Sequence, residues 1–262
     1  MKIGFYDSGM GGLSVLNHAM RVLPNEEYLY FADTDNVPYG TKTKEEIVLF
    51  AEDAVSFMIE KGVKAILIAC NTATSVAIAH LREKYSLPIL GMEPAVKPAV
   101  LKSDGKKVLV TATPITVRGE KLKNLIEEIG GEEFCDLLPL PALVNFAENM
   151  QFNTPDVKEY LKHELSSFNL DDYSHLVLGC THFNYFKEAF CSVLPEGIEF
   201  IGGMRGVVSH LKNTLQNLNL LENNSLTVEY YFSKRHVTDK ENMDKIKNFH
   251  KQLDKMYLIN RT

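Results

Sequence analysis

Short apolar runs alternate with segments of helical periodicity along almost the whole chain. Runs of four to eight apolar residues are typical of buried strands, whereas apolar positions that recur every three or four residues are typical of helices packed on a sheet. The runs predict strands at 1–7, 28–33, 65–70, 87–92, 106–113, 135–141, 175–180, 198–203 and 226–234. The periodic segments predict helices at 12–23, 41–62, 72–85, 117–131, 154–165, 184–194, 204–218 and 238–255.

The helix expected at 41–62 has signals at both ends. Thr43 and Glu46 have the spacing of a capping box, and Gly62 suits the residue after the last turn. A second helix begins at Thr154-Pro155, since proline is favoured in the first turn. One face of the first helix is apolar and consists of Ile47, Phe50, Ala51, Ala54 and Met58.

Strands that alternate with helices predict an α/β fold with mainly parallel sheets flanked by helices. The pattern falls into two groups that divide near residue 95. We therefore expect two similar domains, the first formed by 1–95 plus about 207–262 and the second by about 96–206. No linker rich in Gly, Ser or Pro separates them, which favours close packing and an active site in the cleft between the domains.

Composition excludes several other classes of protein. The 262 residues carry a net charge of −6, which gives no basic footprint for nucleic acid. No apolar run approaches the roughly 20 residues of a membrane span, and Asp7 interrupts the N-terminus too early for a signal peptide. We therefore expect a cytoplasmic protein with reduced thiols. The four cysteines show no CxxC spacing, which argues against a metal site.

Two of the cysteines follow apolar runs in nearly matching contexts. Cys70 ends the run 65–70 and is followed by Asn71 and Thr72, and Cys180 ends the run 175–180 and is followed by Thr181. Ligands in parallel α/β sheets bind beyond the carboxyl ends of strands. The two thiols would therefore face each other across the cleft. Similar polar clusters lie at 7–9 and 38–42.

Two facing thiols suit the inversion of a carbon centre. A free thiol has a pKa of about 8.5, so it can act as a base or an acid near neutral pH. One thiolate would remove a proton from one face of the carbon, and the other thiol would deliver a proton to the opposite face. His182 would assist Cys180, and Asp7 would assist Cys70 if the first and third strands are neighbours. Asn71, Thr72 and Thr181 offer donors for a carboxylate.

Several motifs together resemble a known family. DSGMGGLSV, YFADTDNVPYGTK, ACNTATS, GMEPAVKPA and LVLGCTHF, which span residues 7–183, are similar in order and spacing to the glutamate racemases of the aspartate/glutamate racemase superfamily. The resemblance covers residues 1 to about 190. It implies a cofactor-independent enzyme with no metal, which interconverts L- and D-glutamate for peptidoglycan, and it implies a homodimer with no nucleic-acid or membrane partner.

The resemblance also assigns roles to individual residues. It implies that Cys70 and Cys180 are the acid/base groups, assisted by Asp7, His182 and Glu148. The substrate contacts that it implies are Asp7, Ser8, Pro38, Tyr39, Gly40, Asn71, Thr72, Thr116, Thr181 and His182. The chain departs from the usual pattern at Ala32, Asn36, Phe183-Asn184 and Gly202-Gly203.

Three other interpretations stay open at this point. An aspartate racemase would act on a substrate that is one methylene shorter, a difference of only about 1–3 kcal/mol in a pocket. A non-catalytic amino-acid-binding protein would use the two thiols only as cleft walls. A redox sensor would need Cys70 and Cys180 at disulfide distance. Cys191, which lies within an apolar helical pattern, is expected to be a core residue, and Cys135 is expected to be buried or incidental.

Overall fold

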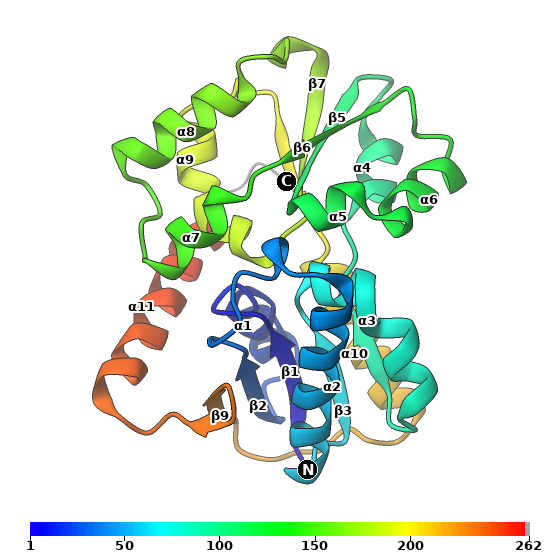
Figure 1. Ribbon diagram of the computed structural model, residues 1–262, viewed down its shortest axis with the longest axis vertical. Coiled ribbons are helices and arrows are strands. Elements are labelled where there is room, and N and C mark those ends of the chain that lie inside the picture. The colour runs from blue at the N-terminus through cyan, green and yellow to red at the C-terminus, as the bar shows by residue number, and fades with distance from the viewer. Residues whose placement is uncertain (260–262) are drawn as a thin grey trace.

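The computed structural model describes residues 1–259, which form two separate sheets flanked by helices (Figure 1). The sheets lie one above the other along the long axis of the molecule, with β1, β2, β3 and β9 in one half and β5, β6 and β7 in the other. This arrangement confirms the predicted α/β class with mainly parallel sheets.

The first sheet has six strands in the order β10-β9-β2-β1-β3-β4. All neighbours are parallel except β10 and β9, which form a short antiparallel pair. Because β1 lies between β2 and β3, the polar residues that follow β1 and β3 meet at one edge of this sheet. The strands are β1 (Ile3–Asp7), β2 (Glu27–Ala32), β3 (Ala65–Ile68), β4 (Ile89–Gly91), β9 (Thr227–Phe232) and β10 (Arg235–His236).

The second sheet has four strands in the order β6-β5-β7-β8, and all of its pairs are parallel. Its central strands β5 and β7 therefore end side by side, at the edge from which Cys180 follows. The strands are β5 (Lys107–Ala112), β6 (Cys135–Pro139), β7 (Tyr173–Leu178) and β8 (Glu199–Gly202).

The chain passes from the first sheet to the second after β4 and returns after β8. On its return, α10 (Met204–Asn217) packs against α1 (Leu13–Val22) and β4, and β9 pairs with β2. The final helix, α11 (Lys240–Tyr257), packs against both α1 and the 3-10 segment η3 (Thr181–Phe186). The division into 1–95 plus about 207–262 and about 96–206 stays a prediction, and these pairings support it.

Most helices begin and end near their predicted positions. The capping box of Thr43 and Glu46 is formed, and Gly62 follows α2 with a φ of 76°, which glycine adopts without strain. The N-cap of α8 is Thr154. The helices on these segments are α2 (Lys44–Glu60), α3 (Asn71–Lys84) and α8 (Pro155–Leu165).

Two predicted helices were wrong in detail. The segment 117–131 contains the end of α5 (Pro114–Arg118) and then α6 (Glu120–Glu128), which are separated because Gly119 adopts an extended ψ of 136°. The segment 184–194 contains the end of η3 and then α9 (Lys187–Cys191). The pattern also missed α4 (Val96–Lys102) and α7 (Ala142–Glu148), since each is only seven residues long.

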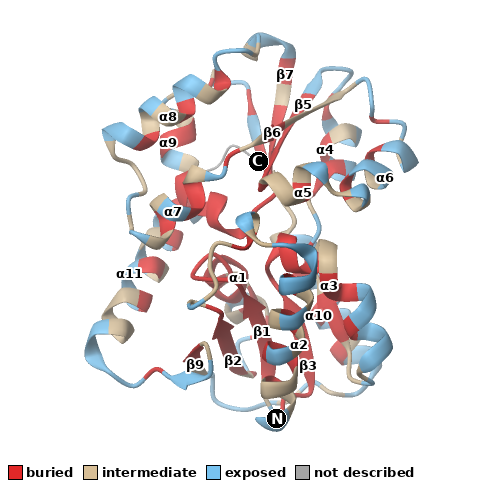
Figure 2. Cartoon of the chain, viewed as in Figure 1, coloured by how far each residue is buried: buried red, intermediate tan, exposed pale blue. Residues whose placement is uncertain are grey.

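The strands form the buried centre of each half, and the exposed residues lie mostly on helices and loops (Figure 2). Every residue of β1 and β3 is buried, as expected for central parallel strands covered on both faces. Cys135 and Cys191 are only partly buried, so the expectation that Cys191 is a core residue was too strong. Within residues 1–259, no helix is both long and apolar enough to cross a membrane.

Candidate active site

Cys70 and Cys180 follow central strands of different sheets and line the same cavity. Cys70 is the N-cap of α3, where its Sγ accepts a hydrogen bond from the Ala73 amide at 3.4 Å. Cys180 precedes η3. Both are free thiols, and they are 5% and 6% exposed. The cavity is lined by Ser8, Tyr39, Gly40, Cys70, Asn71, Thr72, Thr113, Val144, Cys180, Thr181 and His182.

This cavity is small, at about 10 Å³. That volume admits roughly one water molecule. The amino acid that the family resemblance implies is much larger than one water, so binding it would require the walls that carry the two thiols to move apart. Those walls come from the segments after β1, β2 and β3 on one side, and from α7 and the segments after β5 and β7 on the other. Movement of the two halves relative to each other would open the site.

Glycines in the loop after β1 allow it to contact the opposite half. A Cβ on Gly9 would overlap with Glu148 Oε1, and a Cβ on Gly11 would overlap with the side chains of Thr181 and His182. The glycines of DSGMGG therefore allow this loop to pack closely against the loop that carries Cys180.

His182 connects Cys180 to a buried carboxylate. His182 Nδ1 lies 3.7 Å from Cys180 Sγ, and Nε2 lies 2.7 Å from Glu148 Oε1, which also accepts a hydrogen bond from the Met10 amide at 2.7 Å. Burial alone would lower the pKa of His182, but its hydrogen bonds with Cys180 and Glu148 outweigh burial and raise that pKa well above its ordinary value. His182 therefore places a positive charge next to the Cys180 sulfur.

Asp7 lies between the two halves of the site. Its carboxylate accepts hydrogen bonds from the Gly9 amide at 3.0 Å and from the Thr181 hydroxyl at 3.1 Å. Burial raises the pKa of Asp7 to about 6, although the charge of His182 lowers it. Burial also raises the pKa of Cys70 to about 12, and the charge of Asp7 adds to this rise. Cys70 is therefore a thiol at neutral pH, ready to donate a proton.

We expect Asp7→Asn to change how stability depends on pH. The pKa of Asp7 is raised from 3.8 to about 6, so between these values the folded protein binds more protons than the unfolded chain. The contribution of Asp7 to the free energy of unfolding therefore falls as pH rises through that window, by on the order of 3 kcal/mol. Asparagine does not titrate, so the stability of the variant relative to wild type should rise from pH 4 to pH 7.

Denaturant unfolding at pH 4, 5.5 and 7 measures this difference. Asp171→Asn removes an exposed carboxylate instead and serves as the control. A difference between Asp7→Asn and wild type that stays constant with pH would contradict the buried titration.

Three threonine hydroxyls form a cluster at the side of the cavity. Thr72 Oγ1 lies 2.9 Å from Thr113 Oγ1 and 3.5 Å from Thr116 Oγ1, and Thr113 Oγ1 lies 3.0 Å from Thr116 Oγ1. Thr116 does not line the cavity itself but reaches it through this cluster. The sequence interpretation missed Thr113, which directly follows β5. It would have been found by the rule that ligands bind beyond the carboxyl ends of parallel strands. The interpretation also missed Val144, which lies on the unpredicted α7.

Tyr39 is held over the cavity by a buried carboxylate that the sequence interpretation also missed. Asp33 is 5% exposed and accepts hydrogen bonds from Tyr39 Oη at 2.6 Å, Ser233 Oγ at 3.0 Å and Asn36 Nδ2 at 3.0 Å. Tyr39 Oη also lies 2.6 Å from Tyr6 Oη. Pro38, a predicted substrate contact, does not line the cavity, although its neighbours Tyr39 and Gly40 do.

We expect Asp33→Asn to raise the KM of the reaction more than it lowers kcat. In the variant, a neutral amide replaces the carboxylate that accepts a charge-assisted hydrogen bond from Tyr39. The loop that carries Tyr39 then becomes less ordered, and substrate binding weakens by roughly tenfold. Proton transfer should change little, because Asp33 does not line the cavity. Tyr39→Phe should shift KM in the same direction, and Asp35→Asn, which alters an exposed residue of the same loop, should not. A loss confined to kcat would contradict this role.

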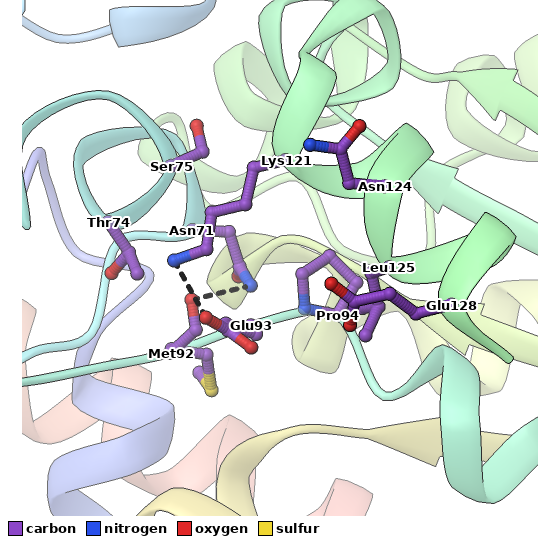
Figure 3. A pocket seen from close by; sticks show the side chains of 10 residues that line it. All are labelled: Asn71, Thr74, Ser75, Met92, Glu93, Pro94, Lys121, Asn124, Leu125 and Glu128. Atoms are coloured by element: carbon purple, nitrogen blue, oxygen red, sulfur yellow. Dashed lines mark hydrogen bonds and ion pairs between the residues drawn. The ribbon is translucent and has the colours of Figure 1, made fainter. Parts of the chain in front are cut away.

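Asn71 also lines a second and larger pocket of about 280 Å³ (Figure 3). Its amide Nδ2 donates to the Met92 carbonyl at 3.4 Å, while Lys121 on α6 pairs with Glu93 at 2.6 Å. The buried Asn71 Oδ1 has no hydrogen-bond partner among the residues that the structure describes. It is therefore available to accept a hydrogen bond from a ligand.

Two parallel α/β halves with a cysteine from each around one cavity define a two-domain racemase fold. A comparison with family models places residues 13–211 in the Asp/Glu/Hydantoin racemase family, and the chain belongs to that family. The curated glutamate racemases of Campylobacter curvus and Lachnospira eligens are 51% and 49% identical to it, each over 99% of this chain and 100% of the relative.

A solved structure agrees with this assignment. Glutamate racemase from Francisella tularensis, crystallised in complex with D-glutamate, superposes with a TM-score of 0.80 at 28% identity, covering 95% of this chain and 93% of that one.

Proposed function

We propose that this chain is a glutamate racemase that moves the Cα proton of glutamate between Cys70 and Cys180. The observation that carries the proposal is that two free cysteines, one from each half of the molecule, line one cavity. The names of the full-length relatives and the D-glutamate complex support glutamate as the substrate.

Each direction of the reaction uses one thiolate and one thiol. With L-glutamate, the Cys180 thiolate takes the Cα proton, and the electron pair of the broken C–H bond stays on the substrate as a carbanion next to the carboxylate. The Cys70 thiol then gives its proton to the opposite face, which leaves Cys70 as a thiolate. The D-enantiomer reacts in the reverse sense. His182 and Glu148 assist Cys180, and Asp7 assists Cys70.

The residues around the thiols would hold the substrate. The unpartnered Asn71 Oδ1 suits the substrate ammonium, and the threonine cluster suits a carboxylate. The proposed substrate contacts are Asp7, Ser8, Pro38, Tyr39, Gly40, Asn71, Thr72, Thr116, Thr181 and His182. We add Thr113 to these proposed substrate contacts because it lines the cavity.

The wider setting follows from the substrate and the family. We expect a cytoplasmic enzyme that supplies D-glutamate for peptidoglycan and works without a cofactor. We also expect it to act as a homodimer. Sedimentation of the purified chain measures the oligomeric state directly.

Uptake of solvent deuterium at Cα tests the activity. In deuterium oxide, the enzyme should exchange the Cα proton of both L- and D-glutamate and form the opposite enantiomer of each. Aspartate, assayed alongside, should react at least about tenfold more slowly, because one methylene group contributes about 1–3 kcal/mol to binding in a pocket. Faster exchange with aspartate would indicate an aspartate racemase, and tight binding without exchange would indicate a binding protein.

A further inference from the structure

A pocket of about 300 Å³ lies where the chain returns from the second sheet to the first. Its walls come from α4, the end of β7, β8, the first turn of α10 and the end of α11. The pocket therefore borders both halves of the molecule. Its volume is at the lower end of the range for small-molecule sites.

Three cationic side chains line this pocket. They are Lys102 on α4, Lys187 at the start of α9 and Arg205 in the first turn of α10. None of them forms an ion pair or a side-chain hydrogen bond with another residue in the range 1–259. The one acidic residue in the lining, Glu199, is 3.5 Å from His175. Such an unbalanced cluster is unexpected in a chain whose net charge is −6.

Lys187 is the least exposed of the three cations. Its side chain is half-buried, and burial lowers its pKa, an effect to which the nearby charge of Arg205 adds. Holding two like charges together costs free energy that a bound anion would recover. The N-terminal turn of α10 also lines the pocket, and its dipole favours negative charge.

The rest of the lining is largely apolar. Phe200 and Ile201 on β8, Leu178 on β7, Met204 on α10 and Tyr257 on α11 form this part of the wall. A fully hydrated ion such as inorganic phosphate would leave this surface uncovered. A ligand that carries an anionic group on an apolar or aromatic body would satisfy both parts of the wall.

Close packing fixes the first turn of α10, which carries Arg205, at this crossing. A Cβ on Gly203, the N-cap of α10, would overlap with the Glu93 carbonyl, so only glycine lets this turn approach the earlier crossing after β4. Gly202, the residue before this N-cap, lines the pocket itself.

We propose that this pocket binds a small organic anion, with a phosphate or carboxylate group held by Lys187, Arg205 and Lys102 and an apolar body against Phe200, Ile201 and Tyr257. The site is separate from the cavity of the two cysteines. Binding here does not depend on racemase activity, so the two proposals fail independently.

Calorimetry with phenyl phosphate on the full chain, at fixed ionic strength, tests the site. We expect saturable binding with one probe per chain, weaker binding of inorganic phosphate and none of phenol. Arg205→Gln and Lys187→Met should each weaken binding by about tenfold, since each removes one charge-assisted contact. Lys212→Gln, which alters an exposed cation on the same helix, should leave the affinity unchanged.

The remaining outcomes decide the matter. Benzoate in place of phenyl phosphate distinguishes a carboxylate from a phosphate preference, and tighter binding of either supports the site. If neither phenyl phosphate nor benzoate binds saturably to the wild-type chain, the proposal is overturned. Equal affinity of wild type, Arg205→Gln and Lys187→Met would overturn it as well, provided that thermal unfolding shows both variants to be folded.

Discussion

Racemisation is expected to fall by about a thousandfold or more when either Cys70 or Cys180 is replaced by serine. General acid–base catalysis contributes roughly 10²–10⁴-fold, and a serine hydroxyl is far too weak an acid to serve as a base at neutral pH. Both thiols are needed in each turnover, so either single change should stop the reaction in both directions. Circular dichroism of the amino acid measures the loss directly.

The two single variants should nevertheless keep different partial activities. Loss of a leaving group from a β-chloro analogue of glutamate needs only the base that faces the Cα proton. Cys70→Ser should therefore still eliminate chloride from the L-analogue, because Cys180 is intact. Cys180→Ser should do so only with the D-analogue. This crossed pattern is specific to two bases on opposite faces.

Two other cysteines provide matched controls. Cys135 and Cys191 are partly buried and do not line the cavity, so Cys135→Ser and Cys191→Ser should retain near wild-type racemisation. Near wild-type racemisation in either Cys70→Ser or Cys180→Ser would count decisively against the two-thiol mechanism.

The surroundings prepare the two thiols for opposite tasks. Burial, and after it the nearby charge of Asp7, raises the pKa of Cys70 and favours the neutral thiol. Cys180 lies beside His182, whose pKa is raised, against the effect of burial, by its hydrogen bonds with Cys180 and Glu148. In the proposed mechanism, such a resting site would remove a proton with Cys180 and deliver one from Cys70. This direction corresponds to the conversion of L- to D-glutamate.

The sequence predicted the parts of the site that follow strands. Cys70, Thr72, Cys180 and Thr181 were found because parallel strands place the residues after them at one edge. The predicted role of Asp7 beside Cys70 required β1 and β3 to be neighbours, and the two strands are paired in the structure. These features depend on periodicity and chain order, which are visible in a single sequence.

Other parts were hidden because they depend on contacts between distant segments. Glu148 was named only by the family resemblance, because it reaches His182 from α7, a short helix that periodicity does not reveal. Asp33 acts through Tyr39 and Ser233, and Ser233 lies 200 residues further along the chain. The pocket with Lys102, Lys187 and Arg205 gathers three separate helices. Only the folded arrangement brings these charges together.

Glu148→Gln is expected to lower the pKa of His182 and to slow racemisation by roughly tenfold to a hundredfold, a part of the usual contribution of an acid–base group. Glutamine preserves the shape and an oxygen that can accept from the Met10 amide, so the main change is the loss of negative charge beside the imidazole. Without that charge, burial favours the neutral imidazole. The Cys180 thiolate then loses its cationic neighbour.

The pH dependence separates this effect from simple misfolding. An imidazolium persists below its pKa, so Glu148→Gln should lose it at a lower pH than wild type does. The activity of the variant relative to wild type should therefore fall as pH rises between the two pKa values. Titration of the His182 ring by NMR should show the lowered pKa, and Glu159→Gln, which alters an exposed carboxylate on α8, should change neither measurement. A deficit in activity that is the same at every pH would mean that Glu148 positions His182 without controlling its charge.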